Sequence, residues 1–259
     1  MSWEEQRVSF GANATTYDSI RPDWPATTVH WLTATTDQRL DVIDLGAGTG
    51  KLTRTLVDLG HRVTAVEPSP GMYDVLVSAV PQATAVQAPA ESIPLPDHSA
   101  DVVTVAQAWH WFAQPEAALE VARVLRPGGL LAIAWHERDQ DVPWVQELNE
   151  LAKLPQWQAE ERREAGAKGR VHAGDTQVVL PEPFEPVERT EFEYSLTLSP
   201  AQLAELASSW SYVDTHPQRE QILGRIRELG ERVATEQGTP QQLRLPHRTH
   251  CHRSRTRLL

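Results

Sequence analysis

The sequence predicts an α/β protein with a doubly wound, mostly parallel sheet, and three observations lead to this prediction. From Leu40 onward, short runs of β-branched residues alternate with segments of helical periodicity. One run, at 130–135, is almost entirely apolar, as expected for a strand that helices cover on both faces. At 259 residues the chain is also long enough to bury the core of such a domain. Seven strands are expected, at about 41–45, 63–66, 84–87, 101–105, 130–135, 188–197 and 243–252.

Apolar residues at helical spacing predict the helices between these strands. Leu52, Leu56 and Leu59 form one apolar stripe, and Gly60 suits the C-terminal end of that helix. Further helices are expected at about 71–79 and 117–125. The stretch Arg126-Pro127-Gly128-Gly129 is expected to end the later helix and turn the chain into the strand at 130–135.

The pattern loosens after Trp135. Amphipathic helices are expected around 144–151, 200–206 and 222–233, together with the last two strands. We interpret this part as a helical cap beside the sheet. The prediction is one domain over 1–259, with a core at about 36–136 and the cap and C-terminal strands at about 137–259.

Composition favours a cytoplasmic globular protein. Hydrophobic residues make up 40% and charged residues 23%, and no apolar run approaches the roughly 20 residues of a membrane helix. The first residues include acids and lack the apolar core of a secretory signal. The single Cys251 excludes an internal disulfide.

The net charge of −11 argues against broad binding to nucleic acid. One basic stretch, 244–257, carries five Arg and three His, and we interpret it as a final strand with a solvated face. His250 and His252 would share one face of that strand, with His247 on the other. They have no matching carboxylate or Cys partner in the pattern, so no metal site is predicted.

A glycine-rich loop, Asp44-Leu45-Gly46-Ala47-Gly48-Thr49-Gly50, joins the first strand to the first helix. Ligands of doubly wound sheets bind at the carboxyl ends of the strands, where this loop lies. A phosphate-binding P-loop is excluded because Leu45 and Leu52 stand where its first Gly and its hydroxyl are required. The dinucleotide fingerprint would need a Gly at Lys51, which weakens that reading but leaves it open.

Four segments resemble one family. The glycine loop resembles motif I, E/D-x-G-x-G-x-G, of class I S-adenosylmethionine (SAM)-dependent methyltransferases. The stretch 90–101 is similar to A-E-x-L-P-F-x-D-x-S-F-D of the UbiE-like, methyltransferase type 11 branch, although Pro89 replaces a frequent acid. The stretch 126–131 resembles that family's L-x-P-G-G-x-L turn. The stretch 10–22 resembles the N-terminal helix of small-molecule methyltransferases related to trans-aconitate methyltransferase.

The resemblance implies a Rossmann-like fold and transfer of a methyl group from SAM to a small-molecule acceptor by in-line displacement, leaving S-adenosylhomocysteine. In such enzymes Asp44 and the loop amides would hold the amino-acid end of SAM, and Glu67 would accept from the ribose hydroxyls. The full set of implied cofactor residues is Tyr17, Arg21, Asp44, Gly46, Ala47, Gly48, Thr49, Gly50, Glu67, Pro68, Met72, Ala90, Glu91, Gln107, Ala108 and Trp109.

The acceptor side is expected at Trp109, His110 and Trp111, after the fourth strand. The two indoles would line the pocket or stabilise the sulfonium, and His110 is the candidate general base. A carboxylate acceptor would need no base. Two alternatives stay open: a nicotinamide-dependent oxidoreductase, which lacks the third glycine and a Tyr-x3-Lys pair, and a SAM-binding module without catalysis.

Overall fold

The computed structural model describes residues 24–152, 178–214 and 216–258. The expected N-terminal helix over 10–22, with Tyr17 and Arg21, therefore lies outside the described residues. The positions predicted for both side chains remain predictions.

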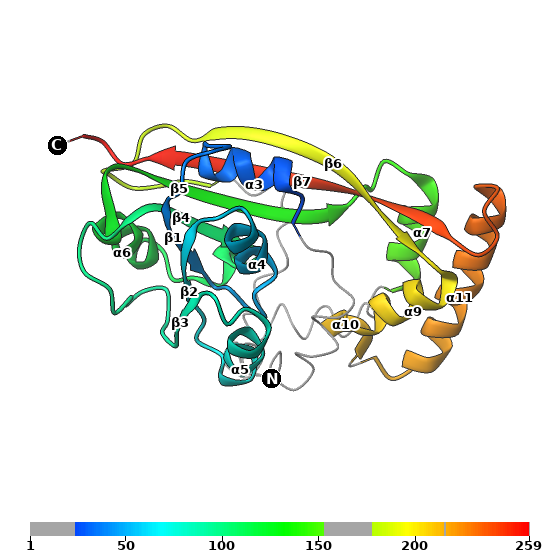
Figure 1. Cartoon of the computed structure of the whole chain (residues 1–259). Helices are drawn as coiled ribbons and strands as arrows, with labels where there is room; N and C mark the ends of the chain where they lie inside the picture. The colour runs from blue at the N-terminus through cyan, green and yellow to red at the C-terminus, as the bar shows by residue number, and fades with distance from the viewer. Residues whose placement is uncertain (1–23, 153–177, 215, 259) are drawn as a thin grey trace.

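The centre of the molecule is a seven-stranded sheet with the order β3-β2-β1-β4-β5-β7-β6 (Figure 1). Neighbours from β3 to β5 pair in parallel, and β7 pairs antiparallel with both β5 and β6. This confirms the mostly parallel, doubly wound sheet. The strands are β1 (Asp41–Leu45), β2 (Arg62–Val66), β3 (Thr84–Val86), β4 (Ala100–Ala106), β5 (Leu125–Arg138), β6 (Glu188–Leu198) and β7 (Leu243–Arg255).

Helices cover the sheet on both faces because strand side chains alternate between them. Val42 and Val102 pack in a cluster with Leu56 of α4 (Lys51–Asp58). Their neighbours Ile43 and Val103 pack in the opposite cluster, which includes α6 (Glu116–Val124). The other helices of this half are α5 (Pro70–Ala79) and α3 (Ala26–Thr33), and α3 was not predicted.

The fifth strand differs from its prediction. It starts at Leu125, directly after α6, and contains the expected turn. Leu125 pairs with Ala100, and the next partners are Leu130 and Val102, so the Pro-Gly-Gly stretch forms a bulge inside β5. Gly128 has a φ of 76°, a conformation that favours glycine. The breaker residues interrupt the pairing without ending the strand.

The cap forms at the far ends of β6 and β7, which run out of the sheet toward a group of helices (Figure 1). The described helices there are α7 (Pro143–Leu151), α9 (Pro200–Ser208), α10 (Ser211–Asp214) and α11 (Arg219–Glu236). Leu198, Leu243 and Leu245 carry the two strands into an apolar cluster of their own with these helices. The cap thus has a core separate from that of the sheet, and the single-domain interpretation remains a prediction.

The basic stretch 244–257 lies mainly in β7, as expected, and two of its histidines are buried. Burial lowers the pKa of both His247 and His252 to about 4. A histidine that is neutral when folded binds its proton more readily when unfolded, so its contribution to stability falls as pH drops from about 6.5 to about 4.

We therefore expect wild-type protein to lose more stability than the variant His247→Gln/His252→Gln between pH 7 and pH 4. Each pKa unit is worth about 1.4 kcal/mol, so the difference should reach a few kcal/mol. Urea unfolding at pH 7, 5.5 and 4 measures it. Parallel losses in both proteins would contradict the prediction.

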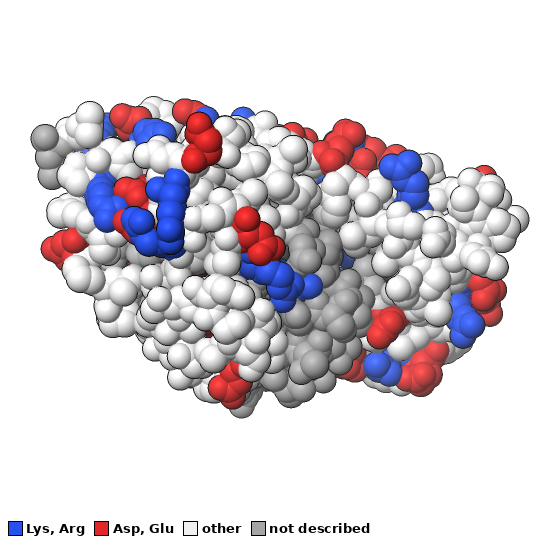
Figure 2. Space-filling model, viewed as in Figure 1, with Lys and Arg blue, Asp and Glu red and all other residues white. Residues whose placement is uncertain are grey.

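The described surface offers neither a membrane span nor a metal cluster. In the described ranges no helix is long and apolar enough to cross a membrane. Within the same ranges, His, Cys, Asp and Glu side chains form no group of three or more that could hold a metal ion. On the face seen in Figure 2, basic side chains lie beside acidic ones in small groups.

Candidate functional site

The glycine loop between β1 and α4 is tied to the end of β2. The amides of Gly46 and Ala47 both donate to the Val66 carbonyl, at 2.8 and 3.1 Å. Gly46, Gly48 and Gly50 have φ values of 71°, 59° and 91°, a conformation that residues with a Cβ rarely adopt. The three glycines therefore fold the loop tightly against the carboxyl edge of the sheet, as the sequence predicted.

The glycine loop also packs directly against Ala108, in the loop after β4. A Cβ added at Gly46 would be 2.6 Å from the Cβ of Ala108. Two segments predicted separately, the loop after β1 and the loop after β4, are thus in contact. The ring of Phe112 also lies beside Gly46, with its Cζ 3.1 Å from the same Cβ position, so this side of the loop is closely packed.

Glu67 stands at the end of β2 with its carboxylate turned toward the loop. One oxygen, Oε2, accepts from the Gly48 amide at 2.9 Å, and Oε1 accepts from the Ser69 amide at 2.8 Å. The side chain is 5% exposed. Each carboxylate oxygen can accept more than one hydrogen bond, so a carboxylate is a group suited to accept from two neighbouring hydroxyls.

The carboxylate of Asp44 lies inside the protein and not on the surface of the site. Its side chain is fully buried and accepts from the Thr53 hydroxyl at 2.6 Å and the Thr104 hydroxyl at 3.1 Å. Burial raises its pKa to about 6, partly opposed by these hydrogen bonds. The carboxylate therefore ties α4 and β4 to β1 beneath the loop. Sequence analysis missed both threonines, because neither belongs to a recognised motif.

Glu91 links the segment after β3 to the segment that follows Phe112. Its Oε1 accepts from the Ala113 amide at 2.7 Å, and the preceding Ala90 is buried. The expected role of Glu91 beside an adenine stays a prediction. On the other side of the loop, the sulfur of Met72 lies 3.8 Å from the position of a Cβ at Gly48.

The loop after β4 leads into a short 3-10 turn, η1 (Trp109–Trp111). Gln107 has a φ of 59°, and its side-chain Nε2 donates to the His136 carbonyl at 3.0 Å. Trp109 is 6% exposed and packs edge-to-face on Phe112. Its ring belongs to the core beneath the site, whereas Trp111 is only partly buried.

His110 is exposed and is oriented by a buried indole. Its Nδ1 accepts from Nε1 of Trp135 at 3.2 Å. An indole N–H can only donate, so the neutral imidazole in this contact carries its proton on Nε2. This geometry favours His110 as a hydrogen-bond donor, and the general-base role would require the contact with Trp135 to break. The catalytic role remains a prediction.

A row of rings runs from the sheet toward the cap. Trp24 stacks on His136 at 3.7 Å between centroids, His136 lies 4.8 Å from Tyr194, and Tyr194 stacks on His247 at 5.0 Å. Since Gln107 donates to the backbone of His136, this row begins beside the loop after β4. No sequence motif connects these four positions.

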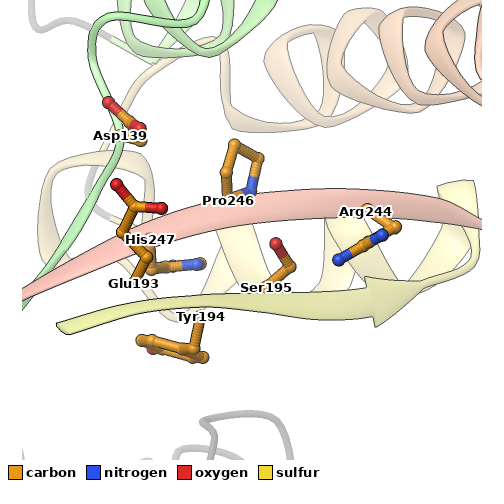
Figure 3. Close-up of a pocket in the computed structure, with 7 residues that line it drawn as sticks. All are labelled: Asp139, Glu193, Tyr194, Ser195, Arg244, Pro246 and His247. Carbon is orange, nitrogen blue, oxygen red and sulfur yellow. The ribbon is translucent and has the colours of Figure 1, made fainter.

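A cavity of about 270 Å³ adjoins the far end of the row, where β6 and β7 leave the sheet. In Figure 3, Tyr194 points to one side of β6 while Ser195 points to the other, as expected for successive strand residues. The cavity is lined by Asp139, Glu193, Tyr194, Ser195, Arg244, Pro246 and His247.

Several known proteins that this chain resembles are methyltransferases. The family model described as a methyltransferase domain matches residues 43–133. An uncharacterized methyltransferase of Mycobacterium bovis is 42% identical over 260 residues, covering 98% of each chain. An uncharacterized methyltransferase-like protein of Schizosaccharomyces pombe is 30% identical over 238 residues, or 90% of each. A solved structure of a candidate type II methyltransferase from Anaeromyxobacter dehalogenans has a TM-score of 0.64 and 26% identity, covering 92% of this chain and 98% of that one.

The glycine loop, Glu67 and the strand order define a class I methyltransferase, and the relatives agree. The chain belongs to the SAM-dependent class I methyltransferases. SAM is its cofactor, and the predicted Rossmann-like fold and methyl-transfer function are confirmed. These relatives give no support to the nicotinamide-dependent oxidoreductase or to a non-catalytic SAM-binding module.

Proposed function

We propose that this methyltransferase transfers the methyl group of SAM to a small-molecule acceptor bound between the loop after β4 and the cap. The observation that carries the proposal is the contact of Glu67 with the Gly48 amide, because it sets beside the glycine loop a carboxylate that could accept from the ribose hydroxyls. The amino-acid end of SAM would then lie over the glycine loop. Its ammonium would be attracted by the buried charge of Asp44, since Coulomb attraction is weakly screened in a protein interior.

The acceptor would meet the methyl group beside η1. Methyl transfer from a sulfonium is an in-line displacement, so orientation and exclusion of water supply much of the rate. Trp111 and the donor face of His110 would form one wall of that space. A nucleophile that arrives without a proton suits a His110 that donates from Nε2, because no base is then required.

The charge distribution favours a small acceptor over a nucleic acid. The net charge is −11, and two of the four arginines of β7 pair with acids: Arg248 with Asp139 and Asp141, and Arg253 with Glu188. Phosphate backbones are bound by clustered, available basic side chains. The same composition supports a cytoplasmic location, as the sequence predicted.

Calorimetric titration with S-adenosylhomocysteine and, separately, with NAD tests the cofactor geometry. Binding of S-adenosylhomocysteine in the micromolar range and none of NAD is expected. A labelled-methyl transfer screen over carboxylates, phenols and amines then tests the acceptor. Labelling of RNA or protein with none of these small molecules would contradict the proposal.

Glu67→Gln is expected to weaken S-adenosylhomocysteine binding about tenfold or more, because an amide NH2 would replace one accepting oxygen beside a backbone N–H. Calorimetry measures the change. The control is Glu147→Gln, which removes an equivalent charge from an exposed ion pair in the cap. Equal affinities of Glu67→Gln and wild type would show that the ribose lies elsewhere.

A further inference from the structure

The segment between β3 and β4 has neither helix nor strand, yet side chains of α6 hold it in one conformation. It runs from residue 87 to residue 99 and includes Ala90 and Glu91, which the proposed function places beside the adenine. Glu91 also reaches across to the Ala113 amide. A shift of this segment would therefore disturb both the adenine side and the loop that leads into α6.

One arginine makes most of the contacts to this segment. Arg123 donates to the carbonyls of Ile93 and Leu95 at 2.8 and 2.9 Å, and to the carboxylate of Asp97 at 2.6 Å. Glu120, one turn earlier on α6, accepts from the Ile93 amide at 2.6 Å. Arg123 donates to both oxygens of Glu120 as well, at 2.8 and 2.7 Å.

The geometry of this clamp depends on the guanidinium. A planar fork with five donors can join two carbonyls and two carboxylates at once, whereas an ammonium cannot match several fixed directions. Glu120 is 15% exposed, and the hydrogen bonds from Arg123 hold its pKa below the usual value. The pair is thus ionised and partly shielded, the condition in which charge-assisted hydrogen bonds are strongest.

A neighbouring arginine provides the contrast. Arg126 pairs with Asp41 and Asp101, at the amino ends of β1 and β4. Ligands of this fold bind at the opposite, carboxyl edge. Both arginines join segments distant in sequence through acids, but only Arg123 holds a segment that reaches the cofactor edge.

We propose that Arg123, oriented by Glu120, is a positioning residue for the adenine end of SAM. It fixes the backbone from Ile93 to Asp97, so that Ala90 and Glu91 present one arrangement to the cofactor. The proposal rests on the proposed function for the place of the adenine. It also explains the spacing of acids in the stretch 90–101, because Asp97 meets Arg123 while Asp101 meets Arg126.

Titration of the full chain with S-adenosylhomocysteine tests the proposal in Arg123→Ala, Arg123→Lys and the control Arg126→Ala. We expect about tenfold weaker binding in Arg123→Ala, partial recovery in Arg123→Lys, and affinity within about twofold of wild type in Arg126→Ala. Hydrogen exchange of the peptide 90–99 should accelerate in Arg123→Ala, with no change over 41–58. If Arg123 only stabilised the fold as a whole, hydrogen exchange would accelerate in both peptides.

The outcomes divide clearly. Wild-type affinity in Arg123→Ala, or an equal loss in Arg126→Ala, would overturn the proposal. If Arg123→Ala does not fold, Arg123→Lys decides by the same two measurements, and wild-type affinity with unchanged exchange would overturn it. Absence of binding by the wild-type protein would instead refute the proposed function.

Discussion

Asp44→Asn is expected to make the protein more stable at pH 7 while weakening its binding of S-adenosylhomocysteine at least about tenfold. The carboxylate is fully buried, and burial raises its pKa to about 6. Ionising it at neutral pH therefore costs folding free energy, which a neutral amide of the same shape avoids. The same charge is what would attract the ammonium of SAM, so stability and affinity should change in opposite directions.

The pH dependence follows from the sign of this shift. An acid whose pKa is about 6 when folded and about 3.8 when unfolded binds more protons in the folded state between those values. Its ionisation destabilises the fold as pH rises through that window. The advantage of Asp44→Asn should thus be greatest above pH 6, at roughly 3 kcal/mol or less, and vanish near pH 4.

Thermal unfolding at pH 7 and pH 4, with calorimetry at pH 7, measures both effects. Asp58→Asn, which neutralises an exposed acid near the end of α4, is the matched control and should change neither. A lower melting temperature for Asp44→Asn at pH 7 would show that the Thr53 and Thr104 hydrogen bonds outweigh the desolvation of the charge. Unaltered affinity for S-adenosylhomocysteine would show that the charge of Asp44 does not contribute to binding the cofactor.

Gly46→Ala is expected to abolish measurable S-adenosylhomocysteine binding and to destabilise the protein by several kcal/mol. The φ of 71° alone costs a residue with a Cβ about 1–2 kcal/mol. The new Cβ would also stand 2.6 Å from the Cβ of Ala108. Because backbone hydrogen bonds tie the loop to Val66, the clash must push β1 and the loop after β4 apart at the cofactor edge.

Gly60→Ala is the control that separates the cost of a positive φ from the cost of a clash with Ala108. Gly60 has a φ of 88°, but a Cβ there would meet nothing within 4 Å. It should lose only the backbone contribution, about 1–2 kcal/mol, and bind S-adenosylhomocysteine like wild type. Urea unfolding and calorimetry compare the two variants. Equal stability losses would mean that the contact with Ala108 relaxes without consequence.

The features that sequence predicted best are local in the chain. The glycine spacing, the acid at the end of the second strand and the alternation of strands and helices each need only a short window. Strand order then brought the loop, Glu67 and Ala108 together at one edge, as the doubly wound fold requires. The Pro-Gly-Gly stretch was misjudged because pairing with β4 continues on both sides of it.

The features that sequence did not reveal depend on contacts between distant segments. Trp135 of β5 donates to His110 in η1 and thereby decides which nitrogen of the neutral imidazole carries the proton. Thr53 and Thr104 meet the buried Asp44 from two different elements. Such contacts produce no recognisable pattern in the sequence, because the residues that make them are far apart in the chain and each is common in helices or strands.

The sequence by itself was enough to predict the class of protein, a SAM-dependent methyltransferase. The reason is that the glycine turn and the acid at the end of the second strand are short, local patterns that binding of this cofactor requires. Only the tertiary structure decided how the site is held. It buried the carboxylate of Asp44, set the Nδ1 of His110 to accept from Trp135, and joined Arg123 to the segment between β3 and β4. The physical reason is that charge, tautomer and backbone position are set by burial and by hydrogen-bond partners, which the folded chain alone brings within reach.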